Sequence, residues 1–145
     1  ARAQHSGGKL IASEPVPAEE MARMLRESAA ALVSLKPLVG YLDARPTKAM
    51  AALATGTPLV YAGTGQFREE LEEQGLGYFA DWSLPQVIQA LESAIAGARA
   101  PDQQLAMRAR AREYARTRFD LSVTARLAAD AVASTSPRDR SQSSP

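Results

Sequence analysis

The stretch that decides the fold is Asp43-Ala-Arg-Pro-Thr-Lys-Ala-Met-Ala-Ala-Leu-Ala-Thr-Gly-Thr-Pro-Leu-Val-Tyr-Ala62. Pro46 sets the backbone φ angle of a first helical turn, and Gly56 followed by Pro58 ends a helix. The run from Pro58 to Ala62 is short and apolar, which is typical of a buried strand in a parallel sheet. The stretch therefore predicts a loop, a helix and a central strand.

Two more apolar runs lie upstream, at residues 10–13 and 30–35, and we expect both to be strands. Between them the spacing becomes helical from Pro17, with Met21 and Met24 expected to pack in the core. Strand, helix and strand form a βαβ unit.

We therefore expect residues 30–35 and 58–62 to be adjacent parallel strands, with Val33 and Val60 almost fully buried. In that arrangement the loop 36–45 opens at the carboxyl edge of the sheet, where ligands of open α/β folds bind. The sequence thus predicts where a ligand site should lie before it predicts the ligand.

Downstream of the central strand the pattern continues to alternate between strand and helix. The expected elements are a helix at 67–74, a strand within 75–80, a helix capped by Ser83, a basic helix from Pro101 and a last helix after Asp120. Trp82 is expected to plug the sheet edge, with stacking on an acceptor as the alternative. The arginines of the basic helix are expected to point mainly outward into solvent, so no nucleic-acid partner is predicted.

Residues 1–9 are polar and expected to be flexible, residues 10–133 form one predicted domain, and the Ser- and Pro-rich residues 134–145 form a predicted disordered tail. The chain begins with Ala, and we expect it to be a piece of a longer protein.

The start of the helix at Pro46 is suited to phosphate. Free backbone N–H groups and the positive end of the helix dipole meet a guanidinium, a hydroxyl and an ammonium from Arg45, Thr47 and Lys48. The alternative is that Pro46 and Thr47 only start a helix while the two charges are solvated. The turn Gly63-Thr-Gly65 adds only a weak phosphate signal, because no third glycine follows at the dinucleotide spacing.

The same run resembles the Pro-Ser/Thr-Lys-x-x-Glu-x-x-Ala-x-Gly-x-Pro signature of the C-terminal, donor-binding domain of GT-B glycosyltransferases of the retaining group 1 family. The matching residues are Pro46, Thr47, Lys48, Ala54, Gly56 and Pro58. The resemblance implies an α/β fold with a Rossmann-like parallel sheet, flanking helices and a helical C-terminus, which is the C-terminal half of a GT-B fold. It also implies a nucleoside-diphosphate sugar as donor substrate, no cofactor, and a separate N-terminal GT-B domain of the same parent protein as partner.

The resemblance also implies roles for single residues. Asp43 stands at the position of an acid near the transferred sugar, while Arg45, Thr47 and Lys48 would hold the diphosphate, and Pro15 and Val16 fall in the turn that holds the base.

Ala51 stands where the family carries a glutamate that binds the ribose hydroxyls. Loss of such a charge-assisted hydrogen bond typically costs roughly 1.5–3 kcal/mol, so weak donor binding, or none, is expected.

The composition of the chain excludes several kinds of site and partner. The 145 residues are 46% apolar and 23% charged, with a net charge of +1 and no cysteine, which excludes disulfides and a strong field for nucleic acid. His5 is the single histidine, and no Asp or His cluster has metal-ligand spacing, so no metal is predicted. No apolar run approaches the roughly 18 residues of a membrane span. We expect a soluble cytoplasmic protein, with peripheral membrane contact through the second domain left open.

Two other functions stay open. The chain could be a non-catalytic GT-B-like interaction domain in which Ala51 replaced the acid, or, less favoured, half of a nucleotide-sugar epimerase, which has a similar two-domain architecture.

Overall fold

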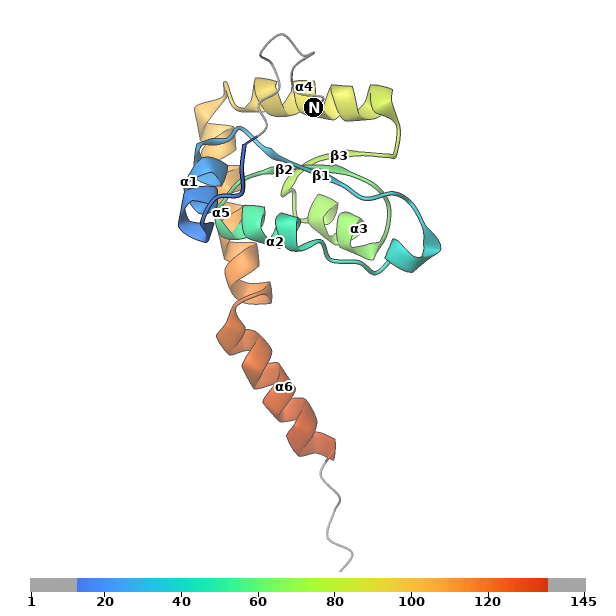
Figure 1. Ribbon diagram of the computed structural model, residues 1–145, viewed down its shortest axis with the longest axis vertical. Helices are drawn as coiled ribbons and strands as arrows, with labels where there is room; N and C mark the ends of the chain where they lie inside the picture. Colours follow the sequence, from blue (N-terminus) through green and yellow to red (C-terminus); the bar gives the residue numbers. More distant parts are fainter. Residues whose placement is uncertain (1–12, 136–145) are drawn as a thin grey trace, which may run out of the picture.

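The computed structural model describes residues 13–135 of the chain, with side chains described as far as residue 131. Its elements, in chain order, are α1 (Ala18–Glu27), β1 (Ala31–Ser34), the 3₁₀ helix η2 (Val39–Tyr41), α2 (Thr47–Ala54), β2 (Leu59–Ala62), α3 (Gln66–Glu73), β3 (Gly77–Ala80), α4 (Leu84–Gly97), α5 (Pro101–Arg118) and α6 (Leu121–Thr135). The protein is therefore an α/β protein with a helical C-terminus (Figure 1).

The three strands of the described chain form one parallel sheet in the order β1-β2-β3. Val33 of β1 pairs in register with Tyr61 of β2. Val33 is 1% exposed and Val60 is 0% exposed. The predicted adjacency of these two strands and the burial of both valines are confirmed.

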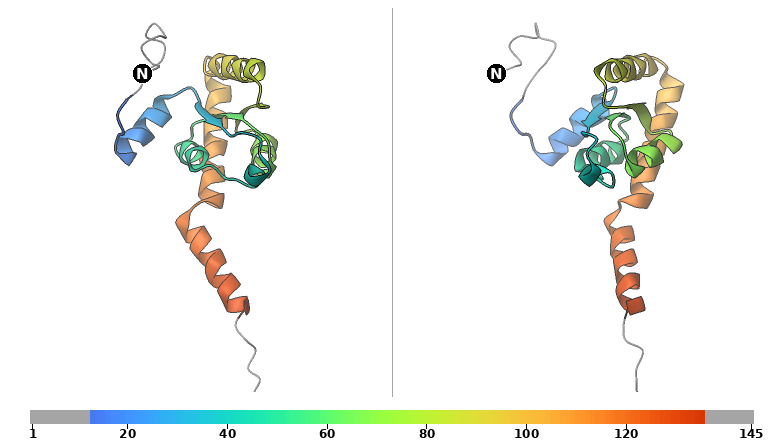
Figure 2. Two further views of the ribbon diagram at one scale, coloured as in Figure 1. Left: turned by 45° about the vertical axis from the view of Figure 1, so that its right-hand side comes forward. Right: turned by 90° about the vertical axis from the view of Figure 1, so that its right-hand side faces the viewer.

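Successive residues of a strand point to opposite faces of the sheet. The buried strands therefore present apolar side chains on both faces, and helices cover both. On one face Val60 and Ala80 pack with Ala90 and Ala94 of α4. On the other face the larger cluster, which includes Tyr61, joins the sheet to α2, α3 and α5 (Figure 1). Figures 1 and 2 show α6 extending away from this body beyond the end of α5.

Helix α5 runs past the C-terminal ends of α2 and α3. Arg108 donates to the carbonyl oxygen of Gly56 at 3.3 Å, and Arg110 donates to that of Gly75 at 3.2 Å. Cations are favourable at the carboxyl end of a helix, where the carbonyl groups lack helical partners. Arg108 also bonds the carbonyl of Arg26, at the end of α1. The expectation that Arg108 points mainly outward is therefore wrong.

One further expectation about packing is wrong. Met21 and Met24 are 45% and 40% exposed, and Leu25 is the residue of α1 that packs against the core. On α4, the residues fully buried against the sheet are Ala90 and Ala94. Val87 and Leu91 lie on the same face and pack against this cluster, whereas Leu84, Ile88 and Ile95 lie on the rest of the helix and are exposed.

The ends of the chain fall partly outside the described residues. Of the strand expected at 10–13, residues 10–12 lie outside them, and Ser13 is not in a strand. The predicted flexible segment 1–9 and residues 136–145 of the predicted tail also lie outside, while α6 continues to Thr135, two residues past the predicted domain end at 133.

Candidate functional site

The loop between β1 and α2 lies at the carboxyl edge of the sheet and is held against the turn after β2. The backbone N–H of Gln66 donates to the carbonyl oxygen of Leu42 at 3.2 Å. Gly65 has a φ of 116°, and a Cβ there would lie 2.3 Å from the same carbonyl oxygen. The glycine of this turn is therefore required by the close approach of two backbones.

The start of α2 is open. Its N-cap residue is Pro46, no side chain caps the helix, and its first turn carries no acid. Ala49 and Met50 donate their N–H groups to the carbonyl of Pro46, but among the described residues the N–H groups of Thr47 and Lys48 have no acceptor. Both of these residues are exposed. Two N–H donors and the positive end of the helix dipole thus lie at one exposed point, in residues whose side chains carry a hydroxyl and an ammonium.

Arg45, just before this helix, is already paired. Its Nη2 lies 3.0 Å from Oε2 of Glu70, and its guanidinium lies 5.1 Å from the ring centroid of Phe67. Arg118 approaches the other oxygen of Glu70 at 3.3 Å. Glu70 was not anticipated, since nothing in the sequence links it to Arg45, 25 residues away.

Lys48 and Ala51 face α1. Both line an apolar groove of about 430 Å³ between α1, α2 and β1, together with Met21, Leu25 and Leu32. None of the residues that line this groove is acidic. The position expected to hold the ribose hydroxyls therefore lies beside apolar side chains.

The other predicted site residues are not joined to this helix start. Asp43 is exposed in the loop, Pro15 is exposed and Val16 is half-buried in the segment before α1. No hydrogen bond or ion pair within residues 13–131 links Asp43, Pro15 or Val16 to Arg45, Thr47 or Lys48. The residues predicted for the diphosphate diverge, because Arg45 turns toward Glu70 of α3 while Lys48 lines the groove beside α1. The structure shows no contact from either of them to the residues predicted for the sugar and the base.

A second hollow at the same edge of the sheet was not predicted. It has a volume of about 280 Å³, and its walls come from the ends of β1 and β2 and from the start of α4: Ser34, Ala62, Trp82, Ser83, Leu84 and Val87. Trp82 is 47% exposed, so it forms a wall of this hollow and is not a buried plug.

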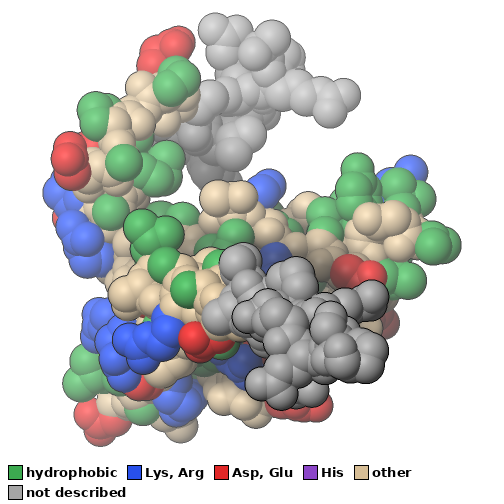
Figure 3. Space-filling model, turned by 90° about the horizontal axis from the view of Figure 1, so that it is seen from below, with side chains coloured by type: hydrophobic (Ala, Val, Ile, Leu, Met, Phe, Trp, Pro, Cys, Tyr) green, Lys and Arg blue, Asp and Glu red, His purple; other side chains and the backbone are tan. Residues whose placement is uncertain are grey.

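The loop itself presents apolar side chains to solvent. Leu38, Val39, Tyr41 and Leu42 are 45%, 88%, 45% and 42% exposed. In Figure 3 the projection at the right, which is the part of the chain around η2 in Figure 1, is covered with hydrophobic side chains. Exposed apolar patches of this kind are found at surfaces that contact a protein, a membrane or a ligand.

Within the described part of the chain, no group of three or more Asp, Glu, His or Cys residues could hold a metal ion. None of the helices described there is both long enough and apolar enough to cross a bilayer.

Comparisons of the chain with family models, with curated proteins and with solved structures find no match.

Proposed function

We propose that this chain is the donor-binding part of a GT-B glycosyltransferase, a group 1 retaining enzyme that transfers a sugar from a nucleoside-diphosphate sugar to an acceptor. The observation that carries the proposal is the uncapped start of α2 at the carboxyl edge of a parallel sheet, with Thr47 and Lys48 exposed beside its free N–H groups. Such a helix start is a ready site for phosphate. A cytoplasmic location is part of the proposal.

In this proposal the leaving diphosphate is stabilised by fixed dipoles and cations. The N–H groups of Thr47 and Lys48 and the Lys48 ammonium would meet the charge that develops on the diphosphate as the sugar departs. Arg45 would join them after exchanging Glu70 for a phosphate oxygen. No metal takes part in this scheme.

The acceptor would be held by a second domain. The exposed apolar residues of the loop, Leu38, Val39, Tyr41 and Leu42, supply a surface against which an N-terminal GT-B domain could pack, next to the diphosphate position. The proposed activity therefore belongs to the two domains together, and this chain by itself would bind the donor without transferring the sugar.

The test is calorimetry of the chain with UDP, GDP and ADP, and then with the corresponding nucleotide sugars. We expect weak binding, because Ala51 offers no acceptor to the ribose. Lys48→Ala should weaken binding about tenfold, and Ala51→Glu should tighten it by roughly 1–2 kcal/mol. Arg99→Ala, which removes a cation beyond the far end of α4, is the matched control and should leave the affinity unchanged.

The competing function is a non-catalytic GT-B-like interaction domain. Two observations favour it: Arg45 is occupied by Glu70, and Ala51 lies in an apolar groove. If neither the parent chain nor Ala51→Glu binds any of the three nucleotides at millimolar concentration, the donor-binding proposal is wrong and the interaction domain is favoured. The third possibility, half of an epimerase, gains no support from any observation of the described residues.

A further inference from the structure

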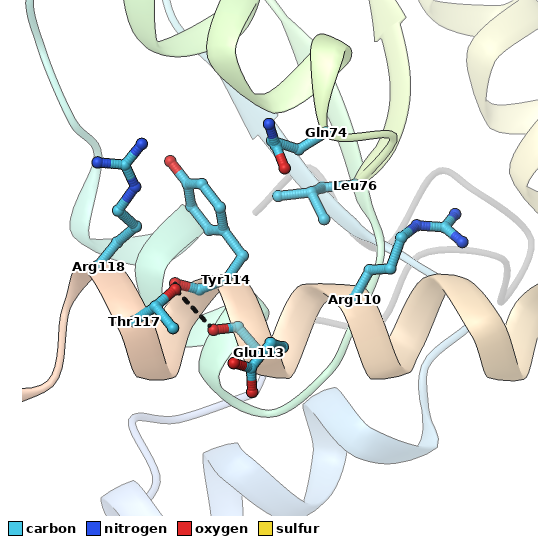
Figure 4. A pocket seen from close by; sticks show the side chains of 7 residues that line it. All are labelled: Gln74, Leu76, Arg110, Glu113, Tyr114, Thr117 and Arg118. Carbon is cyan, nitrogen blue, oxygen red and sulfur yellow. Dashed lines mark hydrogen bonds between the residues drawn. The ribbon is translucent and has the colours of Figure 1, made fainter.

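A hollow of about 260 Å³ lies between the end of α3 and the middle of α5, on the side of the sheet where β3 begins. It is lined by Gln74, Leu76, Arg110, Glu113, Tyr114, Thr117 and Arg118 (Figure 4). None of the residues proposed for the donor belongs to this hollow. Its volume is roughly nine times the 30 Å³ that one water occupies in the liquid, so it can accept a small molecule.

The spacing of residues on α5 builds the hollow. Arg110, Tyr114 and Arg118 follow one another at intervals of four, so their side chains lie on one face of the helix. In Figure 4 the two arginines stand at opposite ends of the hollow and Tyr114 rises between them, with its hydroxyl on the side of Arg118. The two cations thus flank one phenol.

The hydroxyl of Tyr114 is a buried donor without an acceptor. Tyr114 is 7% exposed, and no hydrogen bond to its hydroxyl has acceptable geometry, although the Glu70 carboxylate and the Arg45 guanidinium are near enough to influence it. Burial, and then the Glu70 carboxylate, raise the pKa of Tyr114 to about 12, so the hydroxyl keeps its proton near neutral pH. A buried polar group without a partner is unusual and costly, and a bound acceptor would satisfy it.

The arginines retain unused donors. Arg110 donates from Nη2 to the carbonyl of Gly75 at 3.2 Å, which leaves most of its five N–H groups available. Arg118 meets Glu70 at 3.3 Å, longer than the roughly 2.7–2.9 Å of a strong charge-assisted bond. Arg118 is 60% exposed, so its side chain can turn toward a ligand without disturbing the core.

The acid on the rim of the hollow is neutralised. Both carboxylate oxygens of Glu113 accept from Arg116, at 2.6 and 2.9 Å. This pairing holds the pKa of Glu113 below its ordinary value. The Glu113 carboxylate is therefore charged, and both of its oxygens already accept hydrogen bonds from Arg116. The free polar groups of the hollow are therefore mainly donors, which favours a ligand rich in acceptors.

We propose that this hollow binds the phosphate group of a small phosphorylated molecule, held between Arg110 and Arg118 with the hydroxyl of Tyr114 as a third donor. Two guanidinium groups match the oxygens of a phosphate, and arginine is well suited to this recognition because of its planar set of donors. All three donors come from α5, and the hollow lies beside the end of α3. The hollow shares no lining residue with the proposed donor site, but the two are linked through Glu70, whose carboxylate pairs with both Arg45 and Arg118.

The test is an NMR titration of the full chain with inorganic phosphate at constant ionic strength, adjusted with chloride, in which the side-chain N–H signals of Arg110 and Arg118 are followed. We expect a saturable shift of both signals, and sulfate should compete for the same site. Tyr114→Phe should weaken binding about threefold to tenfold, and Arg118→Gln about tenfold or more. Arg126→Gln, which removes a cation elsewhere, should leave the dissociation constant unchanged.

Three outcomes would overturn the proposal. A response that never saturates would mean that phosphate only screens charge, and an unchanged dissociation constant in Tyr114→Phe would remove the buried hydroxyl from the site. Loss of the shift in Lys48→Ala would assign the phosphate to the start of α2. If circular dichroism shows that Arg118→Gln is unfolded, Tyr114→Phe decides, because it removes one oxygen atom and leaves the ring to pack.

Discussion

The two ends of α2 differ in almost every respect. At its C-terminal end the N–H groups of Gly56 and Thr57 bond the carbonyls of Leu53 and Ala52, which is the Schellman pattern. The Thr57 hydroxyl donates to the carbonyl of Leu25 at 2.7 Å. At its N-terminal end no side chain caps the helix.

The difference separates stability from function within one short helix. At the closed end the hydrogen bonds join α1, α2 and α5, so that end fixes the position of the helix. At the open end the unpaired N–H groups of Thr47 and Lys48 lower the stability of the helix unless a ligand or water satisfies them. Substitutions at the closed end should therefore change folding, and substitutions at the open end should change binding.

The largest effect is expected at Gly56. Its φ is 74°, and a Cβ there would lie 2.9 Å from the side chain of Arg112 and 3.1 Å from the carbonyl oxygen of Arg108. A left-handed backbone costs a residue with a side chain about 1–2 kcal/mol before any clash. Gly56→Ala should therefore lower the free energy of unfolding, measured in urea, by about 2–4 kcal/mol.

Gly40 supplies the matched control. A Cβ at Gly40 meets nothing within 4 Å, and its φ is not in the left-handed region. Gly40→Ala should change the free energy of unfolding by less than about 0.5 kcal/mol. Equal stability of the two variants would contradict the view that the end of α2 is a rigid anchor.

The next largest effect is expected at Arg108, which bonds the carbonyls of Arg26, Ser28 and Gly56. Burial, and then the neighbouring Arg112, lower its pKa, which reflects a cation held partly out of water. Arg108→Met keeps much of the aliphatic chain and leaves three carbonyls without this donor. We expect a loss of about 1.5–3 kcal/mol in urea denaturation.

Arg126→Met, on the exposed side of α6, is the control for the loss of one positive charge. It should leave the urea midpoint almost unchanged. If both variants are equally stable, the contacts of Arg108 do not anchor the closed end.

The sequence predicted local structure well and long-range pairing poorly. The strands around Val33 and Val60 could be anticipated, because apolar runs between turn residues are local signals. Gly56 and Pro58 likewise fixed the end of α2 correctly. These features depend on residues close together in the chain.

The errors have a common physical origin in contacts between distant residues. Whether Met21 is buried depends on how far α1 lies from the sheet, and helical periodicity cannot reveal that distance. The inward path of Arg108 depends on carbonyls up to 82 residues away. In the candidate site, Arg45, Thr47 and Lys48 were predicted together because they are neighbours in sequence. The ion pairs of Glu70 and the hollow around Tyr114, in contrast, form only because α3 and α5 come together in the fold.

The smallest effect is expected at the open end, from Glu70→Gln. Glu70 holds Arg45 at 3.0 Å, and the side chain of Arg45 is 49% exposed. An exposed pair of this kind contributes roughly 0–1 kcal/mol. Replacing the carboxylate with a neutral amide should release Arg45 to a diphosphate and raise the affinity for UDP in calorimetry about threefold, with little change in stability.

The control is Glu72→Gln, which instead breaks an ion pair with Arg68. It removes the same charge from α3 and so controls for the change in net charge. An affinity that rises equally in both variants would show that only net charge matters. Glu70 also pairs with Arg118, so the origin of a gain is decided by adding Arg45→Ala. A gain that is confined to Glu70→Gln and lost with Arg45→Ala would show that Arg45 belongs to the site that binds the diphosphate.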